Sequence, residues 1–124
     1  MSKAARSLFA FGIYVVITAL GFIAAPEMLM SLLGLPPATA GWARLIGLLA
    51  LVIGAYDIVG ARSESLAYIR ASVYVRTGFA LGTFVLVALG QMPPTILLLG
   101  ASDIAGAIWT ALALRGHSPA VATA

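Results

Sequence analysis

Four long apolar stretches follow one another along the chain, and short segments with charged residues, proline or glycine separate them. A helix needs about 20 mostly apolar residues to cross a lipid bilayer. The pattern therefore predicts four membrane-spanning helices, at about residues 8–25, 42–61, 71–90 and 95–114. We expect an all-α fold in which one transmembrane domain, residues 1–124, forms an up-and-down four-helix bundle.

The connection between the first two spans carries a helix signal of its own. Pro26 and Glu27 are typical of a helix start, and Gly34, Pro36 and Pro37 are typical of a stop. Apolar residues recur between them with helical spacing. We expect a short helix that lies in the outer membrane interface, either as a simple connector or as a lid over the mouth of the bundle.

Composition agrees with a membrane protein and narrows its chemistry. The chain has 124 residues, of which 62% are hydrophobic and 9% charged, and a mean hydropathy of +1.09. A soluble domain of this size would not tolerate these values. The chain has no cysteine, which excludes thiol redox chemistry and thiolate metal ligands. His117 is the single histidine and follows the last span, so we expect neither a histidine metal site nor a serine–histidine catalytic pair in the membrane.

The basic residues lie at the ends of the spans rather than in a run, which is typical of topology signals. One side of the predicted bundle carries Lys3, Arg6, Arg62, Arg70, Arg76 and Arg115, and the other carries Arg44 alone. Cytoplasmic loops are the ones that carry an excess of lysine and arginine. We therefore expect both termini in the cytoplasm.

No motif for a dinucleotide, a phosphate loop or a haem is present, and we expect no cofactor, no metal and no nucleic-acid partner.

Small residues line one face of the second span and one face of the fourth. They recur at spacings of three and four, together with an aspartate in each span, at Ala43, Gly47, Ala50, Gly54, Asp57 and Ala61, and at Ile96, Gly100, Asp103, Ala107, Thr110 and Leu114. Small residues let helices approach closely in lipid, so we expect both faces to point into the bundle. The segments 54–61 and 100–107 match at six of eight positions, through either an internal duplication or chance in a chain rich in small residues. In the third span, Gly78 and Gly82 indicate internal helix packing rather than a dimer interface.

Three charged residues are predicted to lie deep in the bundle. With a rise of about 1.5 Å per residue, Asp57 lies about 6 Å from the inner end of its span, Arg76 about 8 Å, and Asp103 near the middle of the membrane. Such residues usually face the interior and pair with one another. We expect Arg76 to reach Asp57 directly. Arg44 is shallow and is expected to extend to the lipid headgroups.

Two interpretations of this cluster remain open. In the structural one, an ion pair between Asp57 and Arg76 holds the helices together, and Asp103 is hydrogen-bonded to the hydroxyl of Thr77, Thr83 or Thr110. In the functional one, the same residues, with Tyr56 and Tyr74, form the polar end of a pocket for an amphipathic lipid, quinone or sterol-like molecule, or part of a proton path.

Several short motifs are shared with a known group of proteins. They are Ala25-Pro26-Glu27 leading to Leu33-Gly34-Leu35, then Arg44-Leu45-Ile46-Gly47, an arginine early in the third span, and the segment from Asp103 to Arg115. In these the chain resembles the small bacterial DoxX-like and BphX-like membrane proteins. The resemblance implies a multi-pass protein of the bacterial inner membrane with an accessory role.

Our first hypothesis for the function is an accessory or scaffold subunit of a larger inner-membrane assembly, whose partners are the lipid bilayer and other membrane subunits. The alternative is a binder or transporter of a lipophilic small molecule through the cluster of Asp57, Arg76 and Asp103. A third reading is an isomerase-like enzyme with a carboxyl group as general acid. The sequence favours a non-enzymatic role over this third one.

Overall fold

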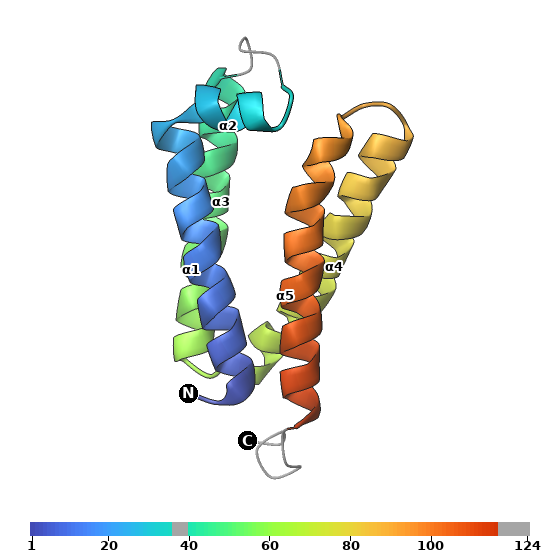
Figure 1. Ribbon diagram of the computed structural model, residues 1–124. Helices are drawn as coiled ribbons and strands as arrows, with labels where there is room; N and C mark the ends of the chain where they lie inside the picture. The colour runs from blue at the N-terminus through green and yellow to red at the C-terminus, as the bar shows by residue number, and fades with distance from the viewer. Residues whose placement is uncertain (36–39, 117–124) are drawn as a thin grey trace.

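The computed structural model describes residues 1–35 and 40–116, which form helices joined by turns and short irregular segments, with no strand among them. In chain order the elements are α1 (Lys3–Ala24), α2 (Pro26–Leu32), α3 (Ala40–Arg62), α4 (Leu66–Ala88), the 3₁₀ turn η2 (Pro94–Ile96) and α5 (Leu97–Arg115) (Figure 1). The predicted all-α fold is confirmed. The predictions made for Pro36, Pro37 and His117 lie outside the described residues.

The four long segments, α1, α3, α4 and η2 with α5, are each long and apolar enough to cross a membrane. Two of them begin five residues before the predicted span, α1 at Lys3 and α4 at Leu66. The reason is local, because Ser2 and Ser65 cap these helices: their hydroxyls accept hydrogen bonds from the backbone N–H of Ala5 and Tyr68. Hydropathy marks where the apolar run begins, whereas the cap decides where the helix begins.

The short helix expected in the first connection is present as α2. Pro26 is its first residue, and Gly34 follows its end with a φ of +70°, which glycine adopts readily. Met30 and Leu33 pack against Phe22 of α1 and Ala43 of α3. The Thr95 hydroxyl donates a hydrogen bond to the Leu33 carbonyl. Through these contacts α2 joins α1 and α3 to the start of the last long segment.

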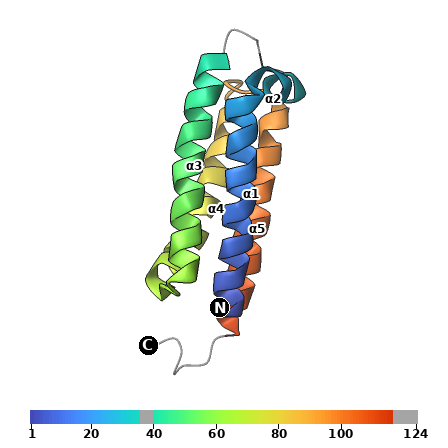
Figure 2. The ribbon, with the colours of Figure 1, turned by 90° about the vertical axis from the view of Figure 1, so that its left-hand side faces the viewer.

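The long helices form two close pairs, α1 with α3 and α4 with α5, and α1 also contacts α5. The consecutive helices α3 and α4 touch little beyond the end where a short loop connects them, so the two pairs diverge toward the end that carries α2 (Figures 1 and 2). At the converging end Leu8, Ala61 and Ile69 are buried in one apolar cluster. The arrangement is a splayed four-helix bundle rather than a closed one.

Glycines make the close approach of α1 and α3 possible. A Cβ atom on Gly47 would lie 2.9 Å from the Ala19 carbonyl oxygen, and one on Gly54 would lie 2.8 Å from Cγ2 of Val16. Both distances are too short for non-bonded atoms, so a larger residue would force the helices apart. The predicted small-residue face of α3 is thus buried, with Asp57 on it.

The small-residue face of α5 is buried in the same way at Gly100, Ala107 and Thr110. The prediction for Gly78 and Gly82 is wrong. A Cβ atom on either would meet nothing within 4 Å, so these two glycines face out of the described molecule rather than into a helix seam.

Candidate functional site

A cleft of about 480 Å³ lies between the two helix pairs. Its volume falls in the range usual for small-molecule sites. All four long helices line it, mostly with apolar side chains: Phe11, Tyr14, Val15, Thr18, Phe22, Ile46, Leu49, Ala50, Ile53, Tyr56, Asp57, Tyr68, Ala71, Ser72, Val75, Arg76, Phe79, Leu99, Ser102 and Asp103. The charged members of this lining are the three residues predicted to lie deep in the bundle.

The cleft opens sideways, between α3 and α4. Ile53 and Tyr56 on α3, and Val75 and Phe79 on α4, line the cleft and are exposed at the same time. They form its rim, because α3 and α4 do not pack against each other at this level. On the opposite side α1 and α5 are in contact at Ser7 and Thr110 and at Phe11 and Gly106. One turn further along α1, Tyr14 lines the cleft and is exposed.

Arg76 is buried in the site, with 5% of its surface exposed. Its Nε donates a hydrogen bond to the Ser72 carbonyl (3.2 Å), and its Nη2 donates to Oγ of Ser72 (3.1 Å) and to Oγ1 of Thr110 (2.9 Å). Its Cζ lies 4.6 Å from the centroid of the Phe11 ring, where the face of the aromatic ring attracts a cation. Arg76 therefore ties α4 to both α5 and α1.

The hydroxyls of Ser72 and Thr110 both accept hydrogen bonds from Arg76, because each donates its own proton elsewhere. Oγ of Ser7 donates to the Ala4 carbonyl at 2.7 Å, and since a hydroxyl has one proton, the 2.8 Å bond between Ser7 and Thr110 is donated by Thr110. Thr110 is left as an acceptor for Arg76. Ser72 likewise donates to the Ile69 carbonyl and accepts from Arg76. This relay stabilises the buried cation and fixes its orientation.

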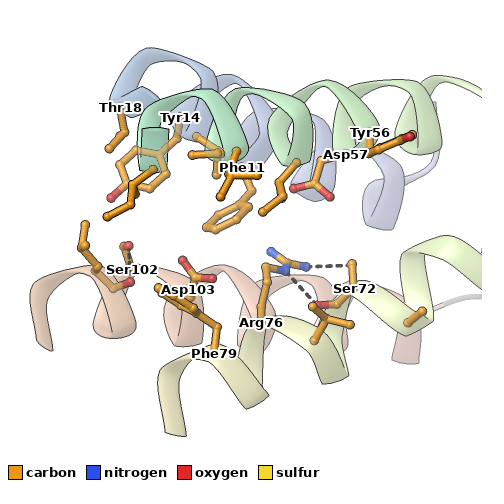
Figure 3. A pocket seen from close by; sticks show the side chains of 18 of the residues that line it. Phe11, Tyr14, Thr18, Tyr56, Asp57, Ser72, Arg76, Phe79, Ser102 and Asp103 are labelled. Carbon is orange, nitrogen blue, oxygen red and sulfur yellow. Dashed lines mark hydrogen bonds between the residues drawn. The ribbon is translucent and has the colours of Figure 1, made fainter. Parts of the chain in front are cut away.

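One end of the guanidinium is unused. Nη1 of Arg76 is buried and has no hydrogen-bond partner in the described part of the chain. Gly106 leaves the space beside it, because a Cβ there would lie 2.9 Å from Nη1. Leaving a buried donor unpaired costs about 1–3 kcal/mol, and more for a charged group. Figure 3 shows the guanidinium directed into the cleft, between the side chains of Asp57 and Asp103.

Asp57 has a different partner from the one predicted. Its carboxylate accepts a hydrogen bond of 2.9 Å from the Tyr68 hydroxyl, and only 5% of the residue is exposed. Among the described residues no ion pair forms between Arg76 and an aspartate, so the predicted direct pair is not what the structure shows. Both Asp57 and Asp103 still interact with Arg76 electrostatically.

Asp103 lies on α5, is half-buried and points into the cleft (Figure 3). It makes no hydrogen bond within residues 1–35 and 40–116, and the three threonines predicted as its partners are engaged elsewhere. Thr77 donates to the Val73 carbonyl, Thr83 donates to the Ala80 carbonyl, and Thr110 belongs to the relay around Arg76. Asp103 and Nη1 of Arg76 are thus two polar groups without a described partner in one cleft.

The two tyrosines proposed for the cluster are placed differently. Tyr56 stands at the rim of the cleft, whereas Tyr74 is 79% exposed and does not line it. Two residues correspond to about 200° around a helix, so Tyr74 points away from the face that carries Arg76. That face carries Tyr68, Ser72 and Arg76 at intervals of four. This spacing is the signal that would have placed Tyr68 and Ser72 in the site from the sequence.

Arg44 lies outside the cleft. It is exposed, and its Nε donates a long hydrogen bond of 3.4 Å to the Ile23 carbonyl. In the described ranges no three histidine, cysteine, aspartate or glutamate side chains are grouped so that they could hold a metal ion. The polar chemistry of the site therefore rests on Arg76, Asp57 and Asp103 and the hydroxyls around them.

Comparison of the chain with known protein families, with curated protein sequences and with solved structures gave no match. The resemblance to DoxX-like and BphX-like proteins stays a prediction. The geometry of the cleft is what an assignment of function rests on.

Proposed function

We propose that this is a multi-pass protein of the bacterial inner membrane, with both termini in the cytoplasm, that binds a lipophilic small molecule in the cleft between α1/α3 and α4/α5. The observation that carries the proposal is the combination of an apolar cleft with one buried arginine whose Nη1 has no hydrogen-bond partner among the residues that the structure describes.

The outer surface of the helices supports the proposal that the protein lies in a lipid bilayer. Besides the length and hydropathy of four helices, large apolar side chains stand exposed on the outer faces, among them Ile17, Val59 and Leu81. Exposed apolar surface that extends over all the long helices is unfavourable in water and suits a bilayer. The distribution of lysine and arginine supports the orientation.

The lining of the cleft supports an amphipathic ligand. Aliphatic and aromatic side chains such as Ile46, Leu49 and Phe79 would cover the body of the ligand, while the charged groups are few and lie together. Most small-molecule sites have this division between an apolar wall and a few polar groups that fix orientation. The opening between α3 and α4 would let such a molecule enter directly from the bilayer.

An accessory subunit of a larger assembly is the second candidate, and the same opening is the observation that favours it. The exposed rim of Ile53, Val75 and Phe79 would accept an apolar helix of a partner, and Gly78 lies on the outside of α4. A partner helix would then cover the cleft instead of a small molecule.

Native mass spectrometry of the full chain, extracted in mild detergent, distinguishes the two. We expect the protein to retain a lipophilic molecule, and Ile53→Trp to lose it because the indole fills the cleft. Val52→Trp is the matched control, since Val52 is exposed on the same helix and does not line the cleft. Retention of a stoichiometric protein partner without any small molecule would favour the accessory subunit, and equal loss in both variants would contradict binding in the cleft.

A further inference from the structure

The charges of the cleft restrict what its ligand can be. One guanidinium, of Arg76, faces two carboxyl groups, of Asp57 and Asp103. A buried guanidinium needs a counter-charge, so at least one of these carboxyl groups is ionised. The positive charge of Arg76 is then already balanced, and the cleft has no excess positive charge for an anion.

Two hydrogen-bonding positions of the cleft are vacant. Nη1 of Arg76 is a buried donor without an acceptor in the described residues, and Asp103 has no described hydrogen-bond partner. Asp57 is different, because Tyr68 already donates to it. The vacant donor and the vacant carboxyl group lie on neighbouring helices, α4 and α5, and both side chains point into the cleft (Figure 3).

We propose that the polar end of the ligand is an uncharged hydroxyl group, which accepts a hydrogen bond from Nη1 of Arg76 and donates one to Asp103. The ligand is then a lipophilic alcohol. This inference rests on the proposed function and specifies the chemical class of the molecule bound there.

Other polar ends fit less well. A carboxylate or phosphate would satisfy Arg76 but would bring a further negative charge next to two carboxyl groups. An ether or ester accepts from Arg76 and leaves Asp103 without a donor. A protonated amine donates to Asp103 but faces the guanidinium with a like charge. The hydroxyl group satisfies both vacant positions and adds no net charge to a buried site.

Three photoactivatable probes test the class directly. They share a sixteen-carbon chain with a diazirine and an alkyne handle, and they end in a hydroxyl, a carboxylate or a methyl ether. The full chain is reconstituted in lipid nanodiscs, irradiated with each probe, and the labelled residues are identified by mass spectrometry with and without excess unlabelled 1-hexadecanol. We expect competed labelling of residues that line the cleft by the alcohol, at about tenfold lower probe concentration than by the acid or the ether, since a hydrogen bond to a charged group is worth about that factor.

Asp103→Asn provides the second arm. The amide keeps the shape of the side chain and removes its charge, so the preference for the alcohol over the acid should fall at least threefold. Glu27→Gln is the matched control, because Glu27 is exposed on α2 outside the cleft and the same change there should leave the preference unaltered.

The outcomes separate this inference from the proposed function. Equal labelling of the cleft by the acid or the ether would overturn the assignment to an alcohol while supporting a lipophilic ligand. An undiminished preference in Asp103→Asn would overturn the role of Asp103 in recognising the hydroxyl. If no probe gives competed labelling in the cleft, the proposed function itself fails.

Discussion

The Tyr68 hydroxyl donates a 2.9 Å hydrogen bond to the carboxylate of Asp57 and so joins α4 to α3 next to the loop that connects them. The ring of Tyr68 also packs against Gly60, one turn after Asp57, where a side chain would collide with it. Farther from this loop, toward the end of the bundle that carries α2, the two helices separate and the cleft begins. This contact therefore helps to set the angle between the helix pairs.

Removing this hydrogen bond should weaken the fold. In Tyr68→Phe the ring and its packing remain, but Asp57 is left buried without a donor, and we expect the free energy of unfolding to fall by about 1–3 kcal/mol. Thermal unfolding in mild detergent, followed by circular dichroism, measures the change. Tyr74→Phe is the control, since Tyr74 is 79% exposed. Equal stability of the two variants would contradict a structural role for the Tyr68 hydroxyl.

The relay around Arg76 makes a second prediction. Thr110→Val keeps the volume of the side chain and removes the acceptor for Nη2 of Arg76 and the donor to Ser7, so unfolding should become easier by about 1–3 kcal/mol. Thr77→Val serves as the comparison, because Thr77 bonds only to a carbonyl of its own helix and is half-buried. Chemical denaturation in detergent would show whether the first variant is the weaker, and a larger loss in Thr77→Val would refute the relay.

Two glycines that the sequence does not distinguish should respond in opposite ways to alanine. Gly106→Ala places a methyl group against Phe11 and Nη1 of Arg76, and overpacking of this kind costs about 1–3 kcal/mol. Gly78→Ala meets open space on the outside of α4 and should be neutral or stabilising by up to about 1 kcal/mol, through helix propensity alone. The melting temperatures of the two variants, compared with that of the unchanged protein, test this difference. A destabilised Gly78→Ala would reveal packing on this outer face.

The proposed orientation is testable because the chain has no cysteine of its own. Single cysteines at Ser63, in the loop between α3 and α4, and at Met92, between α4 and η2, would lie on opposite sides of the membrane. In intact bacterial spheroplasts an impermeant maleimide should label Met92→Cys but not Ser63→Cys, and both should react once detergent is added. Labelling of Ser63→Cys from outside would reverse the topology.

The long helices and their buried faces could be predicted from the sequence, because hydropathy indicates the helices and the spacing of small residues indicates the faces. The run of small residues around Asp57 and Asp103 predicted which faces of α3 and α5 point inward. The pairing of helices could not be predicted in the same way. An up-and-down bundle places consecutive helices such as α3 and α4 side by side, whereas in the structure the glycines of α3 pack against α1 and α3 touches α4 little. Spacing alone also failed for Gly78 and Gly82, because a glycine pair fits a helix seam and an exposed face equally well.

In the polar site, too, the sequence predicted which residues are buried but not which residues they contact. The depth of Arg76 identified it as an interior residue, and the structure places it in the cleft. The hydrogen-bond partners depend on the angular position of each side chain around its helix, which charge and depth in the membrane do not determine. Asp57 accepts a hydrogen bond from the nearby hydroxyl of Tyr68 rather than from the guanidinium, and Arg76 donates to Ser72, one turn away on its own helix. Both partners, Tyr68 and Ser72, lie eight and four positions before Arg76 on α4, so that spacing would have identified them.

The opening of the cleft between α3 and α4 has a consequence for how affinity is to be expressed. In the membrane-embedded protein that we propose, a molecule that enters from the side exchanges with the hydrocarbon phase and not with the aqueous phase. Occupancy then follows the mole fraction of the ligand among the lipids. Two samples with equal total ligand and protein but different amounts of lipid would be loaded to different extents, and a dissociation constant in molar units would change with every preparation. Titrations at several lipid-to-protein ratios should collapse onto one curve only when plotted against mole fraction.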